Sequence, residues 1–257
     1  MPAEANEFIS LEIQDSIAIL TLDRPPLNVL HIPMLEQLES VLASLAGKDT
    51  LRVMILEARG KMFSAGVDVA DHTADKVSVM IPLFNRVCQA LAEFPLPTLA
   101  AVHGHALGGG CELVLCCDLA VIAESAKIGQ PEIHLAAFAP IAAMRLPQLV
   151  GLRAAADMLF TGRSLTAQEA LSLGLVNALV PVDQVAAWAR DKAGQIAGLS
   201  RVALALTKRA LQLGFGNWEA ISPEMEGLYL QDLMQSHDAA EGLAAFMEKR
   251  KPIWQDR

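Results

Sequence analysis

The chain has 257 residues, of which 53% are hydrophobic and 19% are charged, and its formal net charge is −9. That length and apolar content supply a large core for one domain, with or without a small appendage, and they exclude a disordered chain. The excess of acidic residues argues against a nucleic-acid partner, because phosphate backbones favour proteins with a net positive charge.

The N-terminal residues and the cysteines indicate a cytoplasmic protein without a membrane partner. Residues 1–7 are polar and acidic, unlike a signal peptide or an arginine-rich transit peptide. No apolar run reaches the roughly 18 residues that a membrane span needs. The four cysteines lie in apolar segments without C-x-x-C spacing, which favours buried thiols over disulfides or a zinc site. They are Cys88, Cys111, Cys116 and Cys117.

Strand patterns alternate with helix patterns in the first half of the chain. Two runs of alternating residues, 8–13 and 17–22, flank Gln14-Asp15 and predict a hairpin. Pro33 suits the first turn of a helix whose apolar residues share one face. By the same criteria we expect strands at 53–57, 98–102 and 119–122, and helices at 33–45, 81–94 and 109–117.

The second half is predicted to be almost entirely helical. Beyond Pro140 the apolar residues follow the helical period, with breaks at four glycines. Strands mixed with helices, followed by helices alone, indicate an α/β core and a helical C-terminal region. We place the core at residues 1–195 and the helical region at 196–257.

Two loops contain small residues and could bind an anion or a developing negative charge. In Phe63-Ser-Ala-Gly-Val-Asp68, a glycine lets a backbone N–H turn toward a cleft. Gly108-Gly-Gly-Cys-Glu112 opens a helix, where N–H groups and the helix dipole favour negative charge. Taken separately, an ordinary βα loop and a close packing contact explain these segments as well. Ala106 breaks the G-x-G-x-x-G pattern of a dinucleotide site.

Two glutamates accompany these loops. Glu112 lies in the first turn of an apolar helix, where a buried carboxylate needs a partner or a function, although acidic residues also stabilise helix N-termini in general. Glu132 lies in Gly129-Gln-Pro-Glu-Ile133 and taken alone resembles an ordinary loop glutamate. The histidines His103 and His105 are better explained as packing residues than as metal ligands.

Taken together, these motifs strongly resemble the enoyl-CoA hydratase/isomerase (crotonase) family in type, order and spacing. The resemblance extends from Leu22-Asp-Arg-Pro and Asn28 to the Glu248-Lys-Arg-Lys-Pro ending. It implies a spiral of ββα units with C-terminal helices that serve oligomerisation, as a homotrimer or a dimer of trimers. It also implies an acyl-CoA thioester substrate and no separate cofactor, since coenzyme A enters as part of the substrate.

The resemblance also implies roles for individual residues. Val67 and Gly109 match the two backbone N–H donors of an oxyanion hole, and Glu112 and Glu132 match the two catalytic glutamates of the hydratases. Ala65 and Asp68 match the loop beside the CoA adenine, whereas Phe246 and Lys251 match C-terminal positions that contact the nucleotide. A helix dipole favours the ionised form of Glu112, so we expect Glu112 to be the base and Glu132 the proton donor.

One segment departs from the family pattern. Ordinary hydratases carry a Pro-Gly-x-Gly-Gly tract where this chain has Ala136-Ala-Phe-Ala-Pro-Ile-Ala-Ala-Met144. This stretch, with Phe138 and Pro140, and the entry Pro25-Pro-Leu-Asn-Val-Leu30 resemble the cyclic dienoyl-CoA hydratases. That resemblance implies cyclohexa-1,5-diene-1-carbonyl-CoA as the substrate. His134 is a candidate lining residue of the acyl pocket, and we have no explanation for His31.

Two alternative functions remain open at this stage. One is an enoyl-CoA isomerase that moves a proton between carbons with a single glutamate. The other is a relative that binds acyl-CoA without turnover. The presence of both glutamates favours the hydratase over each alternative.

Overall fold

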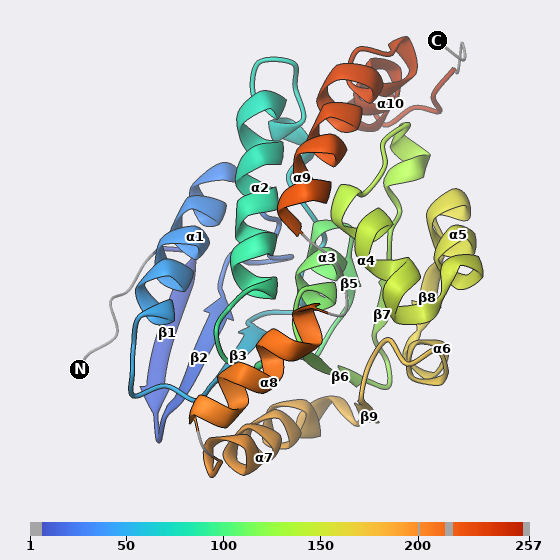
Figure 1. Ribbon diagram of the computed structural model, residues 1–257. Coiled ribbons are helices and arrows are strands. Elements are labelled where there is room, and N and C mark those ends of the chain that lie inside the picture. The colour runs from blue at the N-terminus through green and yellow to red at the C-terminus, as the bar shows by residue number, and fades with distance from the viewer. Residues whose placement is uncertain (1–6, 200, 214–217, 254–257) are drawn as a thin grey trace.

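The computed structural model in Figure 1 describes residues 7–199, 201–213 and 218–253. A six-stranded sheet forms its larger layer, with the strand order β1-β2-β3-β4-β6-β9. Its strands are β1 (Ile9–Gln14), β2 (Ile17–Leu22), β3 (Val53–Ala58), β4 (Thr98–Val102), β6 (Leu119–Ala123) and β9 (Ala178–Val180). Apart from the antiparallel pair β1–β2, all neighbouring strands are parallel.

Local sequence explains the strands that were predicted. Asp15 and Ser16 form a two-residue hairpin turn with positive φ angles of 50° and 67°, a geometry that matches the twist of the flanking strands. All five residues of β4 are buried. Such continuous apolar runs are typical of parallel strands covered on both faces. The predicted hairpin and the three predicted central strands are therefore confirmed.

A second, smaller sheet lies beside the first and has the order β5-β7-β8. Its strands are β5 (Ala106–Leu107), β7 (Lys127–Gly129) and β8 (Ser164–Thr166), and isolated bridges Leu30–Val67 and Ser64–Ala106 extend it. After each of β2, β3, β4 and β6, the chain makes such a bridge or short strand and then enters a helix. This repeated passage is a spiral of ββα units, and the predicted α/β class is confirmed.

Helices cover the sheets and fill the C-terminal half. They are α1 (Ile32–Ala46), α2 (Val77–Ala92), α3 (Gly109–Leu115), α4 (Pro140–Val150), α5 (Leu152–Thr161), α6 (Ala167–Ser172), α7 (Val185–Ala197), α8 (Arg201–Leu213), α9 (Trp218–Gly227) and α10 (His237–Met247). Shorter turns are the 3₁₀ helices η1 (Val69–Asp71), η2 (Glu132–Leu135) and η3 (Val182–Gln184), and the π-helix η4 (Leu228–Leu233).

The structure differs from the sequence predictions in its short elements. Strands β5, β7, β8 and β9 have two or three residues each, too few to produce a period in the sequence. The proposed division at residue 195 falls within the last turn of α7, which packs against β3, β4 and β6.

No helix within the described ranges is both long enough and apolar enough to cross a membrane.

The C-terminal helices fold back over the core. Figure 1 shows α9 beside α2, and α10 packs against η2. At that second contact, Gly242 of α10 lies so close to Leu135 that a Cβ atom on Gly242 would overlap the Leu135 carbonyl group. The absence of a side chain at position 242 thus fixes how closely α10 approaches the turn that carries Glu132.

We expect Gly242→Ala to destabilise the protein by about 1–3 kcal/mol, because the added methyl group forces two backbones apart. Gly194→Ala is the matched control. Gly194 lies in α7 and a Cβ atom there would meet nothing within 4 Å, so the change should be neutral or stabilise by up to about 1 kcal/mol. Denaturant unfolding measures both, and equal effects would contradict this view of the α10 contact.

Candidate active site

A cavity of about 310 Å³ lies where the loop after β3, the start of α3 and the turn η2 meet. Residues from α2, the start of α4, η4 and α10 complete its wall. Its lining residues include most of the residues predicted from the sequence: Ala65, Val67, Gly109, Glu112, Glu132, His134, Phe138, Pro140 and Phe246. The fold therefore brings together groups that are more than 180 positions apart in the sequence (from Ala65 to Phe246).

The backbone amides of Val67 and Gly109 lie close together at this cavity. A Cβ atom on Gly109 would lie 3.3 Å from the Val67 nitrogen, so the two peptide groups are neighbours. Among the hydrogen bonds of the described residues, neither amide donates to a backbone or side-chain acceptor. Two such N–H donors close together are chemically suited to a carbonyl oxygen that gains negative charge.

Buried polar side chains hold the loop that carries Val67. The Ser64 hydroxyl donates to the Asn28 carbonyl at 2.7 Å and accepts from the Gly66 amide at 3.1 Å. The Asn28 side-chain amide donates to the carbonyls of Arg59 (2.7 Å) and Met62 (2.8 Å). Asn28 and Ser64 are fully buried, so these hydrogen bonds fix the loop from beneath without using the Val67 amide.

Glu112 is buried, with only 3% of its surface exposed. Burial raises the pKa of its carboxyl group to about 7, although hydrogen bonds from the Ala142 and Ile141 amides favour the ionised form. The Ala142 amide donates to Glu112 Oε1 at 3.0 Å. The start of α4 thus binds one carboxylate oxygen of Glu112 and fixes the side chain.

Glu132 is half-buried and begins η2, where an irregular loop was expected. Burial raises the pKa of Glu132 to about 8, and the nearby charge of Glu112 adds to the effect. With its NH₂ group turned toward Glu132, the buried Gln130 side chain donates to both carboxylate oxygens, at 3.2 and 3.1 Å. These hydrogen bonds favour the carboxylate, but burial and the charge of Glu112 outweigh them, so Glu132 binds its proton more readily than Glu112.

The structure places the other predicted residues differently. Asp68 caps η1 through the Ala70 amide (3.1 Å) and forms an ion pair with Arg24 at 3.5 Å, and it does not line the cavity. Lys251 is exposed beyond α10 and also lies outside the cavity wall. Their predicted contacts with the nucleotide remain predictions.

The remaining histidines have structural contacts. His103 Nε2 lies 3.0 Å from the Gly60 carbonyl, and His105 Nδ1 accepts from the Lys127 amide at 3.0 Å. His31 precedes α1 and packs edge-on against Phe8, with 4.6 Å between ring centroids. The described residues contain no cluster of three or more side chains that could hold a metal ion.

Sequence reasoning missed two polar residues of the cavity wall, His72 and Tyr229. The His72 Nδ1 atom lies 3.0 Å from the Asp68 carbonyl, and burial lowers the pKa of the imidazole. Tyr229 reaches the cavity from η4, and its ring packs on Phe138 with 5.1 Å between centroids. Neither residue belongs to a motif, so only the tertiary packing reveals them.

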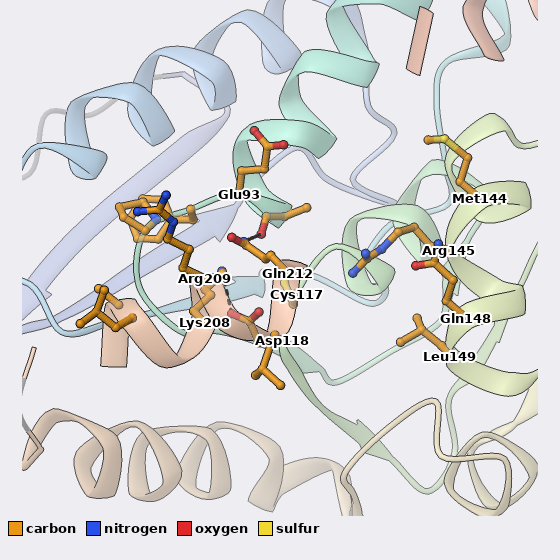
Figure 2. A pocket seen from close by; sticks show the side chains of 16 residues that line it. Glu93, Cys117, Asp118, Met144, Arg145, Gln148, Leu149, Lys208, Arg209 and Gln212 are labelled. Atoms are coloured by element: carbon orange, nitrogen blue, oxygen red, sulfur yellow. Dashed lines mark hydrogen bonds and ion pairs between the residues drawn. The ribbon is translucent and has the colours of Figure 1, made fainter. Parts of the chain in front are cut away.

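A second cavity, of about 660 Å³, lies between α2, α4 and α8 (Figure 2). Figure 2 shows Lys208 directed toward Asp118, and the two form an ion pair of 2.7 Å. Lys208 also donates to the Leu96 carbonyl (3.1 Å), while Asp118 accepts from the Thr98 amide (2.8 Å). Lys208 and Asp118 are therefore occupied in joining α8 to the sheet, and no predicted site residue lines this cavity.

The raised pKa values predict how stability depends on pH. The ordinary glutamate pKa is 4.5, and in the folded protein the pKa values of Glu112 and Glu132 are about 7 and about 8. At pH values between these limits, the folded protein keeps protons that the unfolded chain releases. Stability should therefore fall as the pH rises through this range. Glu132→Gln removes one buried charge and should stabilise the protein by roughly 1–3 kcal/mol at pH 8, with a difference that shrinks toward pH 4.5.

Urea unfolding across this pH range measures the effect. Glu12→Gln, a change of the same type on the exposed face of β1, is the control and should leave the pH profile unchanged. A Glu132→Gln protein with the same pH slope as the unmodified protein would contradict the burial of this charge.

Comparison with known proteins agrees with the motifs and the geometry. The family model for enoyl-CoA hydratase/isomerase matches residues 12–257. The chain is 37% identical over 250 residues to a cyclohexa-1,5-dienecarbonyl-CoA hydratase of Thauera aromatica (96% of each chain). It is 35% identical over 254 residues to a probable enoyl-CoA hydratase of Bacillus subtilis (95% of this chain, 97% of the relative).

Among solved structures, an enoyl-CoA hydratase from Mycobacterium avium subsp. paratuberculosis superposes with a TM-score of 0.87 at 26% identity, over 98% of this chain and all of the other. The resemblance drawn from the three motifs is thus confirmed over nearly the whole sequence. The chain belongs to the enoyl-CoA hydratase/isomerase family.

Proposed function

We propose that this protein is a hydratase that adds water to an unsaturated acyl-CoA thioester. The observation that carries the proposal is the meeting of two free amides and two glutamates with raised pKa values at one cavity. The amides can donate hydrogen bonds to a thioester oxygen. Of the two carboxyl groups, one can accept a proton from water and the other can donate a proton to carbon. The chemistry needs no cofactor beyond the coenzyme A of the substrate.

The Val67 and Gly109 amides would bind the thioester carbonyl oxygen. When a nucleophile adds to the conjugated double bond, electron density moves onto this oxygen and the thioester becomes enolate-like. Fixed N–H donors stabilise that state more than the ground state, because they are already oriented toward the developing charge. Loss of one such donor typically costs about 10²–10³ in rate.

The environments of the two glutamates support different roles for them. The Ala142 amide donates to Glu112 and favours its carboxylate, so Glu112 would accept a proton from water. The charge of Glu112 favours the protonated form of Glu132, which would deliver its proton to carbon. The hydroxide oxygen adds to one carbon of the double bond and the proton of Glu132 to the other. Dehydration runs through the same steps in reverse.

The cavity wall supports a compact, cyclic acyl group. Phe138 and Pro140 line the cavity and belong to the stretch that lacks the glycines of the ordinary hydratase tract, and the aromatic ring of Tyr229 packs against Phe138. A volume of about 310 Å³ limits the size of the bound acyl group. The relative from Thauera aromatica is named for a cyclic dienecarbonyl-CoA. We therefore propose a cyclic dienoyl-CoA thioester, such as cyclohexa-1,5-diene-1-carbonyl-CoA, as the substrate.

We also propose how the rest of the thioester and the assembly are arranged. Ala65 and Phe246 line the cavity, and we assign them, with Asp68 and Lys251 outside it, to the coenzyme A moiety. The helical C-terminal region is proposed to form the contacts of a homotrimer or a dimer of trimers, and the cytoplasm is the proposed compartment.

Replacing either glutamate by glutamine should lower kcat for hydration by about 10²–10⁴, since each variant loses one proton-transfer group. Binding of the thioester should change little, because the amides and the acyl wall stay in place. Glu12→Gln is again the control and should keep full activity. Near-normal hydration by the Glu132→Gln protein would contradict the proposed pair and favour a one-glutamate mechanism.

The acyl wall predicts a preference that steady-state kinetics measure. We expect kcat/KM for cyclohexa-1,5-diene-1-carbonyl-CoA to exceed that for crotonyl-CoA, because Phe138 contacts more of a ring than of a short straight chain. Phe138→Gly should narrow the difference, because it removes the aromatic ring from the wall. Equal kcat/KM values for the two thioesters in the unmodified protein would refute the cyclic assignment.

A further inference from the structure

We propose that the hydroxyl group of Tyr229 binds the oxygen that hydration adds to the acyl group, and so recognises the hydroxyacyl product and the water that precedes it. The inference rests on the proposed hydratase function and names one more substrate-contacting residue. Its basis is a phenol without a partner, held by a fixed ring at the wall of the catalytic cavity.

The Tyr229 side chain is held in a single orientation. Only 1% of its surface is exposed, and its ring belongs to the main hydrophobic core. The ring packs on Phe138 at a centroid distance of 5.1 Å with an interplanar angle of 57°. Tilted aromatic pairs of this kind are favourable beyond the apolar area that they bury. The position of the phenol oxygen is therefore set by packing before any substrate binds.

The backbone around Tyr229 has an unusual form. Residues Leu228–Leu233 form a π-helix, and the Met234 amide donates to the Tyr229 carbonyl at 3.0 Å, five residues back along the chain. Single turns of π-helix occur rarely and are frequently found at functional sites. The wider turn joins α9 to the segment before α10 and presents Tyr229 to the cavity.

The phenol oxygen has no hydrogen-bond partner within the described part of the chain. A buried tyrosine hydroxyl usually finds one. Only two described side-chain atoms are both sealed from solvent and unpaired, His31 Nδ1 and Asn85 Oδ1, and the Tyr229 oxygen is neither. Since Tyr229 lines the cavity, its small exposed area and its free hydrogen-bonding capacity are available to whatever occupies that cavity.

The phenol also lies within the electrostatic reach of both glutamates. Burial raises the pKa of Tyr229, and the charges of Glu132 and Glu112 raise it further, with the larger effect from Glu132. The hydroxyl thus keeps its proton and remains a donor. A water molecule that donates its two hydrogens to the two carboxyl groups keeps two lone pairs, one to attack carbon and one to accept from the phenol. The phenol can then also donate to the hydroxyl that the water becomes.

Tyr229→Phe tests the proposal, because it keeps the ring and its contact with Phe138 and removes only the oxygen. We expect a 3-fold to 10-fold loss of affinity for 2-hydroxycyclohexane-1-carbonyl-CoA, the usual effect of one neutral hydrogen bond. Affinity for cyclohexanecarbonyl-CoA should change by less than about 2-fold, because this thioester has no hydroxyl group with which the phenol could form a hydrogen bond. Equal losses for both thioesters, or no loss for either, would overturn the proposal.

The chain contains a single tyrosine, so a second measurement can observe this hydroxyl directly. Incorporation of 3-fluorotyrosine gives one fluorine NMR signal from position 229. Glu112→Gln blocks turnover during the measurement. The signal should shift more with the hydroxylated thioester than with cyclohexanecarbonyl-CoA, and identical shifts would contradict the assignment. Both experiments measure binding and do not depend on turnover. If the unmodified protein hydrates no dienoyl-CoA, that result refutes the proposed function, and the binding of the hydroxyl by Tyr229 can still be tested.

Discussion

The close approach of the Gly108 backbone to the Glu132 carboxylate is the contact on which the site depends. Gly108 has a φ angle of 52° and a ψ angle of −127°, and a Cβ atom there would lie 2.5 Å from Glu132 Oε1. Any other residue would be strained and would displace the carboxylate. The same turn begins α3, which carries the Gly109 amide and Glu112. One glycine thus fixes three of the proposed functional groups relative to one another.

This arrangement places two carboxyl groups where ionisation is unfavourable, and the surrounding structure must offset that cost. Glu112 receives amide hydrogen bonds from the start of α4, whereas Glu132 receives its support from Gln130. Burial raises the pKa of both groups, and the charge of Glu112 raises that of Glu132 further, which separates the two by their ease of protonation. Because they interact, the pair titrates as a unit, and this shared proton is what a reversible addition of water requires.

Sequence patterns predicted the parts that depend on local chemistry. Alternating residues around Asp15 predicted the hairpin, and the apolar runs of β3 and β4 predicted buried strands. The motifs around Val67, Glu112 and Glu132 predicted one cavity, and the structure places these residues at the same wall. Contacts between distant segments gave no local signal. Tyr229 meets Phe138 across 91 positions, and Lys208 meets Asp118 across 90, so neither pairing produces a spacing that a sequence window detects.

The central claim is that water is a reactant and that two glutamates transfer its protons. Incubation of the protein with cyclohexa-1,5-diene-1-carbonyl-CoA in water labelled with heavy oxygen, followed by mass spectrometry of the thioester, tests it most directly. The account predicts a product that carries one labelled solvent oxygen, and loss of that product in the Glu132→Gln protein. A thioester that exchanges carbon-bound hydrogen with deuterated solvent but never gains oxygen would contradict the account and identify an isomerase.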